Sequence, residues 1–161
     1  MKRVAKTEIT WEIYGSLGEM EEKDKELMQM ARNACDNAYA PYSEFFVGAA
    51  VRLSDGRVEI GSNQENAAYP SGLCAERVAL FGISARLGDV EVETIAVAAR
   101  RSAPDSFVPV TPCGSCRQVM AEYEFRQEKP IRIIMEREDE EMLVSSSVAD
   151  LLPLGFSKKS L

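Results

Sequence analysis

Apolar segments typical of buried strands alternate along this chain with segments that have the 3.6-residue period of helices. The strand patterns lie at residues 45–53, 57–62, 92–100, 131–136 and 142–147. The helical patterns lie at residues 24–39, 73–88, 115–125 and 148–153. Because strands and helices that alternate in this way pack as layers, with helices on both faces of a sheet, we predict an α/β fold.

The connection between the last two strand patterns restricts the topology of the sheet. Only the residues from Arg137 to Glu141 separate them. A parallel crossover needs roughly a dozen residues, so we expect these two strands to be antiparallel. The acidic run from Glu136 to Glu141 is then predicted to be a solvated hairpin tip without a functional role. Asp55-Gly56 indicates another hairpin, between the first two strand patterns.

The chain of 161 residues is long enough for one core without stabilising cross-links. Residues 1–20 show no clear period, so we expect an N-terminal extension (1–20) followed by one domain (21–161). The first ten residues lack the apolar run of a signal peptide, and no stretch approaches the ~20 apolar residues of a membrane span. We therefore expect a cytoplasmic protein with no membrane partner, whose four cysteines form no disulfide framework.

Charge and composition exclude several classes of function. The net charge is −7, and no basic cluster is longer than two residues, which argues against a nucleic acid polymer as partner. The chain contains no histidine. Its absence removes the commonest general base, the Ser-His and Cys-His nucleophilic pairs and every histidine metal ligand. Acid–base chemistry must then use a carboxylate, a lysine, a tyrosine or a metal-activated water.

Three cysteines stand where two of the predicted helices begin. Cys74 lies near the start of one, and Cys113 and Cys116 lie near the start of another. The partial positive charge of a helix N-terminus favours thiolate over thiol. If the two helix starts meet at one edge of the sheet, three thiolates converge in a geometry that suits zinc.

Three thiolate ligands leave one zinc position open, which is typical of a catalytic rather than a structural site. The fourth cysteine, Cys35, lies on the apolar stripe of the first predicted helix and is expected to be buried and free. Glu76, two residues after Cys74, can then exchange protons between a water in the open position and a substrate. A redox C-x-x-C motif of the thioredoxin type and a purely structural zinc site are the alternatives that spacing leaves open.

The motifs CAER (74–77) and PCGSCRQ (112–118) resemble those of the zinc nucleobase deaminases. Three further segments resemble the small homotetrameric cytidine deaminases: YAPYSEFFVGAAV (39–51), GSNQENAAYPSGLCAERVALF (61–81) and LLPLGF (151–156). The resemblance covers roughly residues 24 to 157. It implies a three-layer α-β-α sandwich with a mixed five-stranded sheet.

The resemblance also implies the reaction. Cys74, Cys113 and Cys116 would bind one zinc per chain, and Glu76 would transfer the proton. Cytidine and deoxycytidine would be deaminated hydrolytically to uridine and deoxyuridine plus ammonia, in pyrimidine salvage. The partners expected are a small nucleoside substrate and, in a homotetramer, further copies of the chain.

Four further positions correspond to substrate-binding residues of that family. Asn63 and Glu65, from the family's N-x-E-N pattern, would bind the ribose hydroxyls. Phe45 resembles the aromatic residue that packs on the pyrimidine ring. Phe156 resembles the C-terminal phenylalanine that reaches into the site of a neighbouring subunit.

Two arginines follow the cysteines on their helices. Three thiolates would give a zinc centre a net charge of −1, which weakens its ability to acidify a water. We expect Arg77 and Arg117 to offset this charge by donating hydrogen bonds to the thiolates.

Other members of the superfamily differ from this sequence in recognisable ways. Polynucleotide deaminases carry a helix between the last two strands and need a basic surface. Blasticidin-type deaminases lack the pair seen here at Asn63 and Glu65, and monophosphate deaminases need a phosphate clamp that no basic loop offers. A non-catalytic zinc or redox thiol protein is the alternative outside the enzyme class.

Overall fold

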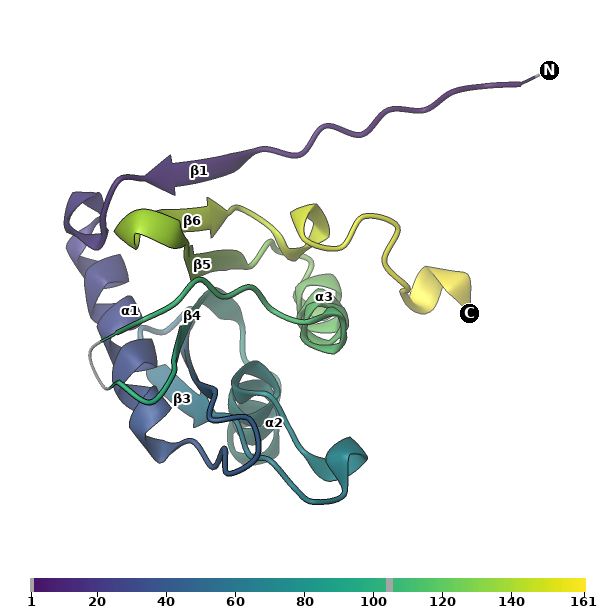
Figure 1. The fold of residues 1–161 in the computed structure, drawn as a ribbon. Helices are drawn as coiled ribbons and strands as arrows, with labels where there is room; N and C mark the ends of the chain where they lie inside the picture. Colours follow the sequence, from purple (N-terminus) through teal and green to yellow (C-terminus); the bar gives the residue numbers. More distant parts are fainter. Residues whose placement is uncertain (1, 104–105) are drawn as a thin grey trace.

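The computed structural model describes residues 2–103 and 106–161 and contains one six-stranded sheet (Figure 1). Its strands are β1 (Trp11–Tyr14), β2 (Phe46–Leu53), β3 (Val58–Ser62), β4 (Val92–Arg100), β5 (Arg132–Glu136) and β6 (Met142–Ser145). Its α-helices are α1 (Glu22–Ala34), α2 (Ala75–Leu87) and α3 (Gly114–Gln127). None of the helices in the described ranges is long and apolar enough to cross a membrane.

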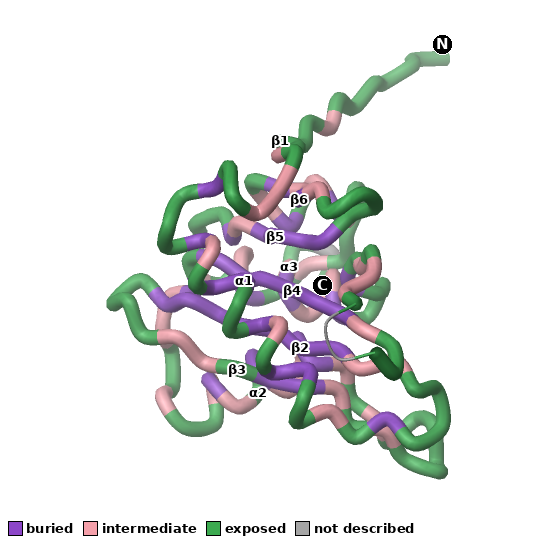
Figure 2. The backbone as a smooth tube through the Cα atoms, turned by 60° about the vertical axis from the view of Figure 1, so that its left-hand side comes forward, coloured by how far each residue is buried: buried purple, intermediate pink, exposed green. Residues whose placement is uncertain are grey.

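The helices lie on both sides of the sheet, as the alternation of patterns predicts. Helix α1 covers one face, and α2 and α3 lie side by side on the other (Figure 1). Two apolar clusters fill the spaces between these layers, one beneath α1 and a larger one beneath α2 and α3. The central strands are buried on both faces (Figure 2). The predicted three-layer α/β fold is confirmed.

The strand order is β1-β6-β5-β4-β2-β3. Strands β4 and β5 are parallel and all other neighbours are antiparallel, so the sheet is mixed. The expected antiparallel pair β5–β6 and the hairpin β2–β3 are both confirmed. Because β4 and β5 are parallel, α3 crosses between them and begins at the carboxyl end of β4.

The acidic run is only partly a solvated tip. Residues 138–140 form an exposed turn, but Glu136 is the last residue of β5 and only 4% exposed. Its side chain faces α1 and accepts a hydrogen bond of 2.6 Å from Arg32 Nε. The prediction that Glu136 is solvated was therefore wrong, because strand alternation continues through this residue and directs it into the space beneath α1.

The sheet has six strands rather than the five that the resemblance implies. The additional strand is β1, which lies within residues 1–20 and pairs with β6 along the register Trp11↔Ser145 to Tyr14↔Met142. Its four residues are too few to show a period by themselves, and the alternation that continues into residues 2–10 is weak because Arg3 and Thr7 stand on the mainly apolar face. The terminal helix expected at 148–153 is a single 3-10 turn at Val148–Asp150, capped by the Ser147 hydroxyl.

Two glycines allow helices to approach the sheet closely. A Cβ atom at Gly61 on β3 would lie 2.5 Å from the Ala75 carbonyl oxygen and 2.6 Å from the Ala79 nitrogen, both in α2. A Cβ atom at Gly48 on β2 would likewise overlap the Ala31 carbonyl in α1. Only glycine permits these contacts. The approach at Gly61 fixes the start of α2, where the first of the three cysteines lies.

Candidate zinc and substrate site

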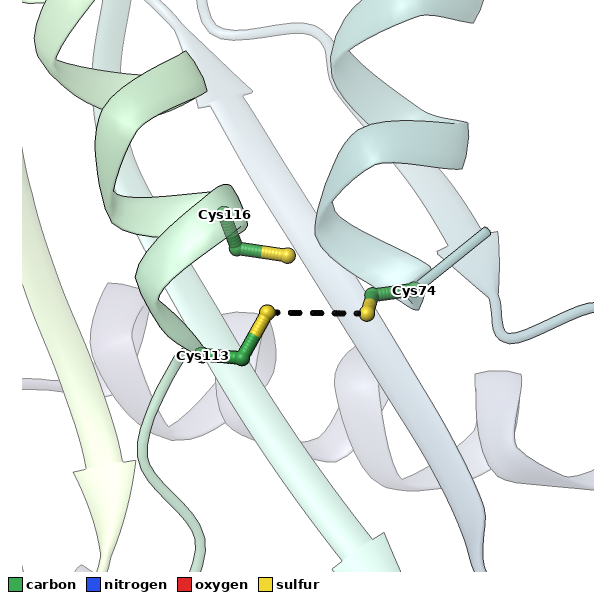
Figure 3. A group of neighbouring side chains, drawn as sticks. All are labelled: Cys74, Cys113 and Cys116. Atoms are coloured by element: carbon green, nitrogen blue, oxygen red, sulfur yellow. Dashed lines mark hydrogen bonds between the residues drawn. The ribbon is translucent and has the colours of Figure 1, made fainter. Parts of the chain in front are cut away.

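Helices α2 and α3 begin next to each other, and their first residues bring three thiols together (Figure 3). Cys74 and Cys113 are the N-cap residues of α2 and α3, and Cys116 lies in the first turn of α3. The three sulfur atoms all lie within 4.8 Å of one another, and Cys74 Sγ is 3.8 Å from Cys113 Sγ. The predicted convergence of the two helix starts is confirmed.

The spacing of these sulfur atoms fits zinc. Tetrahedral coordination with zinc–sulfur bonds of about 2.3 Å places neighbouring sulfur atoms about 3.8 Å apart. Within residues 2–103 and 106–161, no histidine, carboxylate or further cysteine joins the three thiols as a fourth ligand atom. Cys35 is buried on the opposite face of the sheet, where its thiol donates to the Ala31 and Ala98 carbonyl oxygens. The donor set is therefore three thiolates with one position left for another ligand.

Hydrogen bonds among the thiols stabilise one thiolate. The Cys116 thiol donates a hydrogen bond to Cys74, and Arg77 donates another. These bonds, chiefly that from Cys116, lower the pKa of Cys74 to about 5, although burial by itself would raise it. The pKa of Cys116 is raised correspondingly, because it is the donor and is buried. Deprotonated sulfur is the form that binds zinc, so Cys74 is already prepared to bind the metal, whereas Cys116 has to lose its proton on binding.

Glu76 lies in the first turn of α2 beside these sulfur atoms. It is only 3% exposed, and no lysine or arginine in the described part of the chain forms an ion pair with it. Burial raises the pKa of its carboxyl group, and the negative charge of Cys74 adds to this effect. A carboxyl group of this kind holds its proton closer to neutral pH than an exposed one does.

The two arginines differ in what they contact. Arg77 Nη2 donates to Cys74 Sγ over 3.6 Å, as expected from the charge of the cluster. Arg117 makes no such contact and donates instead to the Pro112 carbonyl at 2.7 Å and the Leu151 carbonyl at 2.9 Å. The expectation that Arg117 donates to a thiolate was therefore wrong. Arg117 donates to carbonyl groups in the segment before α3 and in the segment after β6, and so it links these two segments.

A cavity of about 450 Å³ lies in front of Cys74 and Arg77 and contains the predicted ribose-binding residues. The Asn63 side chain is held on both sides. Its Oδ1 accepts a hydrogen bond from Val47 N at 2.8 Å, and its Nδ2 donates to the Phe45 carbonyl at 2.9 Å. The amide orientation is thus fixed, with one Nδ2 hydrogen and one Oδ1 lone pair left for another partner.

Glu65 lines the same cavity, and a loop before β2 holds its carboxylate. It accepts hydrogen bonds from Ser43 Oγ at 2.5 Å, Tyr42 N at 2.9 Å and Ser43 N at 3.3 Å. These bonds, chiefly that from the Ser43 hydroxyl, lower the pKa of Glu65 and keep it ionised. Sequence reasoning did not give Tyr42 and Ser43 a role, although both lie in the motif YAPYSEFFVGAAV.

The two predicted aromatic residues lie apart from each other. Phe45 is partly buried directly before β2 and packs against the apolar cluster that also contacts Cys74. Phe156 is 59% exposed and lines a different cavity, near Phe125 and Lys158. Its carbonyl accepts a hydrogen bond from Gln118 at 2.9 Å. The structure therefore brings together Cys74, Glu65 and Asn63, but not Phe156 of the same chain.

Three thiols at adjoining helix starts, a buried carboxyl group beside them and a cavity in front that contains Asn63 and Glu65 define a zinc-binding site of catalytic type in an α/β sandwich. The model of the cytidine and deoxycytidylate deaminase zinc-binding region matches residues 21–129. The chain belongs to the cytidine and deoxycytidylate deaminase family, and its cofactor is zinc.

Individual relatives agree with this assignment. A cytidine deaminase of Sporosarcina psychrophila is 39% identical over 137 residues, which cover 85% of this chain and 93% of that protein. One of Halalkalibacterium halodurans is 50% identical over 96 residues, covering 60% of this chain and 68% of that protein. The crystal structure of a Burkholderia pseudomallei cytidine deaminase shares 38% identity, with a TM-score of 0.70, and covers 85% of this chain and 100% of its own.

Proposed function

We propose that this protein catalyses the zinc-dependent hydrolytic deamination of cytidine and deoxycytidine to uridine and deoxyuridine, with release of ammonia. The observation that carries the proposal is the thiol cluster with Glu76 beside it, open to a cavity lined by Asn63 and Glu65. The thiols of this site are reduced, as is usual in the cytosol, and we place the enzyme there. Its role would be in pyrimidine salvage.

Cys74, Cys113 and Cys116 would hold the zinc ion. When bound, zinc activates a water for attack on carbon 4 of the cytosine ring. Arg77 draws negative charge from Cys74 through its hydrogen bond, which offsets part of the excess charge of three thiolate ligands. The two helix N-termini act in the same direction.

Glu76 would move the proton in this reaction. It would take a proton from the attacking water and deliver it to the ring nitrogen. It would then pass the remaining hydroxyl proton to the amino group, which leaves as ammonia while the carbonyl bond forms at carbon 4. The pKa of its carboxyl group is raised by burial, so the protonated and ionised forms are closer in free energy near neutral pH. Burial also holds the carboxyl group in place, because the first turn of α2 packs on the sheet through Gly61.

Glu65 and Asn63 would bind the sugar. The ionised carboxylate of Glu65 accepts hydrogen bonds from hydroxyl groups, and the Asn63 amide retains a free donor. The charged residues that line this cavity are Glu65 and Arg77, and Arg77 already donates to a sulfur atom. A phosphate group would meet a carboxylate without a free cation, which favours a nucleoside over its monophosphate.

We further propose that the enzyme is a homotetramer in which Phe156 enters the site of a neighbouring subunit. The side chain is largely exposed in a single chain and lies in a C-terminal segment, where Gln118 holds its carbonyl group. The support for this role is the resemblance of LLPLGF (151–156) to the C-terminal segment of the homotetrameric family, and the exposure leaves the ring free to enter a neighbouring site. Light scattering of the purified protein tests the assembly, and an active monomer would contradict it.

The experiment that tests the reaction is an absorbance assay with cytidine, deoxycytidine and deoxycytidine monophosphate, on protein whose zinc content is measured. We expect conversion of both nucleosides, with little conversion of the monophosphate. Glu76→Gln is the control: it should keep zinc and lose roughly 10²–10⁴-fold in turnover.

Two results would count against the proposal. Metal-free protein that deaminates cytidine at the full rate would exclude zinc chemistry. If the protein were inactive and metal-free and its Cys113–Cys116 pair could be oxidised, the redox alternative would be supported. A titration of free thiols before and after mild oxidation measures this.

A further inference from the structure

Residues 2–10, here called the N-terminal arm, extend away from the body of the molecule in line with β1 (Figures 1 and 2). They belong to no helix or strand, and all of them except Ile9 are exposed. The first residues of a domain are poorly ordered unless other groups hold them, so a partner would be needed to fix the arm in this conformation.

The arm and β1 together have the alternation of a half-buried strand. Odd-numbered residues share the face of Trp11 and Ile13, which are 46% and 53% exposed. That face carries Arg3, Ala5, Thr7, Ile9, Trp11 and Ile13. The even-numbered face carries Lys2, Val4, Lys6, Glu8, Thr10 and Glu12. One face is thus mainly apolar and the other mainly charged, over residues 2–13.

One edge of β1 and of the arm that continues it has no partner strand among the described residues. β1 is the edge strand of the sheet, and in the described residues it pairs only with β6. The N–H and C=O groups on its other edge, and those of the arm, are therefore available to another strand.

We propose that the partner is the arm of a second copy of this chain, paired antiparallel about a two-fold axis at Thr7. In this register Thr7 lies opposite Thr7 of the second chain, and any two residues that lie opposite each other have residue numbers whose sum is 14. Lys6 then lies opposite Glu8, and Lys2 lies opposite Glu12, twice each in the pair. Each charged residue of the even-numbered face meets an opposite charge.

The other face is complementary in the same register. Ile9 lies opposite Ala5, so two small apolar contacts form on either side of the axis. Arg3 lies opposite Trp11, a pair that allows a cation–π contact. A two-fold interface requires a self-complementary surface, and the arm sequence meets this requirement at every charged position.

A polyanion is the other partner that the basic residues of the arm suggest. It would leave Glu8 and Glu12 facing like charges and would not cover Trp11 or Ile13. The pairing with a second copy accounts for the acidic residues, the apolar face and the open edge together.

The test uses cysteine cross-linking of the full-length, zinc-loaded protein in a glutathione redox buffer. In Thr7→Cys the two new thiols lie opposite each other across the axis, so an intermolecular disulfide should join most chains. In the matched control Thr10→Cys, residue 10 lies opposite residue 4, and the two new thiols are roughly 20 Å apart. That variant should cross-link no more than the unsubstituted chain.

Charge exchange tests the register itself. Adding Lys6→Glu to Thr7→Cys places like charges opposite each other twice and should slow cross-linking about tenfold. Adding both Lys6→Glu and Glu8→Lys restores opposite charges and should restore the rate. An unchanged zinc content shows that each variant is folded.

The proposal is overturned if Thr7→Cys cross-links no faster than Thr10→Cys. It is also overturned if the double exchange is as slow as Lys6→Glu alone. Neither result bears on deamination, so this proposal and the proposed function succeed or fail separately.

Discussion

Both faces of the sheet have a buried glutamate, a buried cysteine and a close-approach glycine, but the polar groups have different partners on the two faces. Beneath α1, Glu136 is 4% exposed and Arg32 lies 2.6 Å from it. Beneath α2 and α3, Glu76 is 3% exposed and lies beside thiols, without an ion-pair partner in the described chain. Burial raises the pKa of both carboxyl groups. At Glu136 a hydrogen-bonded arginine, Arg32, opposes the shift, whereas at Glu76 the charge of Arg77 acts without a hydrogen bond and is the smallest of the contributions.

The comparison extends to the cysteines and the glycines. Cys35 under α1 donates to two carbonyl oxygens, whereas the other three cysteines converge on one another. Gly48 allows α1 to approach the sheet, and Gly61 does the same for α2. A buried polar group whose hydrogen bonds are satisfied stabilises the fold, and one whose bonding capacity is left open is available for chemistry. Each prediction below except the last changes one face of the sheet and uses the other as its control.

The largest effect is expected for a cysteine on the α2/α3 face. Cys113→Ala removes one of three thiolates, so zinc should fall from about one per chain to a small fraction, and activity should fall with it. Metal analysis and the cytidine assay measure both. Cys35→Ala is the control: it should cost roughly 1 kcal/mol of stability and keep its zinc and activity. Equal zinc contents in the two variants would contradict the comparison.

The ion pair beneath α1 should affect stability and its pH dependence. Arg32→Leu leaves Glu136 buried without its partner, which should cost about 3 kcal/mol in the free energy of unfolding near pH 8. Zinc content should not change. Denaturant unfolding at several pH values gives the measurement.

The sign of the pH dependence follows from the raised pKa of Glu136. The ordinary pKa of a glutamate carboxyl group is 4.5, so the unfolded chain loses the Glu136 proton near this pH. The folded chain keeps the proton to a higher pH, and the free energy of unfolding therefore falls as pH rises from 4.5 through the raised pKa. Without Arg32 the pKa rises further and the fall is larger. The deficit of Arg32→Leu should therefore shrink toward about pH 4. Adding Glu136→Gln to Arg32→Leu should remove the pH-dependent part of this deficit. If the deficit of Arg32→Leu alone did not change with pH, this account would be refuted.

A smaller effect is expected for the two close-approach glycines. Gly61→Ala and Gly48→Ala each force a helix away from the sheet and should cost roughly 1–3 kcal/mol. Only Gly61→Ala moves the start of α2, so only this variant should also bind zinc more weakly in a competition titration. If Gly48→Ala weakened zinc binding equally, the two faces would not be independent.

The smallest effect is expected for the arginine beside the zinc site. Arg77→Ala should lower turnover about tenfold and leave zinc in place, because it removes the hydrogen bond to Cys74. Arg86 lies further along α2 and pairs with Glu59 at the surface, so Arg86→Ala should not change turnover. Steady-state kinetics of the two variants distinguish a tuning role from a general effect of lost charge.

Most of the regular structure could be predicted from the sequence because it depends on local periodicity. The pattern at 92–100 coincides with β4, and the short link before residue 142 gives an antiparallel pair. The shorter β1 was not recognised, since its stability comes from hydrogen bonds to β6 that no local pattern records. The environments of Glu136 and Arg117 were misjudged for a related reason, because their partners lie far away in the sequence.

What the sequence determined by itself is the chemistry available: three thiols and a carboxyl group at two helix starts, no histidine, and helices alternating with strands. These follow from residue type, spacing and period, which are properties of neighbouring residues. The tertiary structure decided which groups meet. Cys74 reaches Cys113 across 39 residues of chain because β4 and β5 are parallel and Gly61 lets α2 lie close to β3. The same packing gives Glu136 an arginine partner, whereas Glu76 forms no ion pair within residues 2–103 and 106–161.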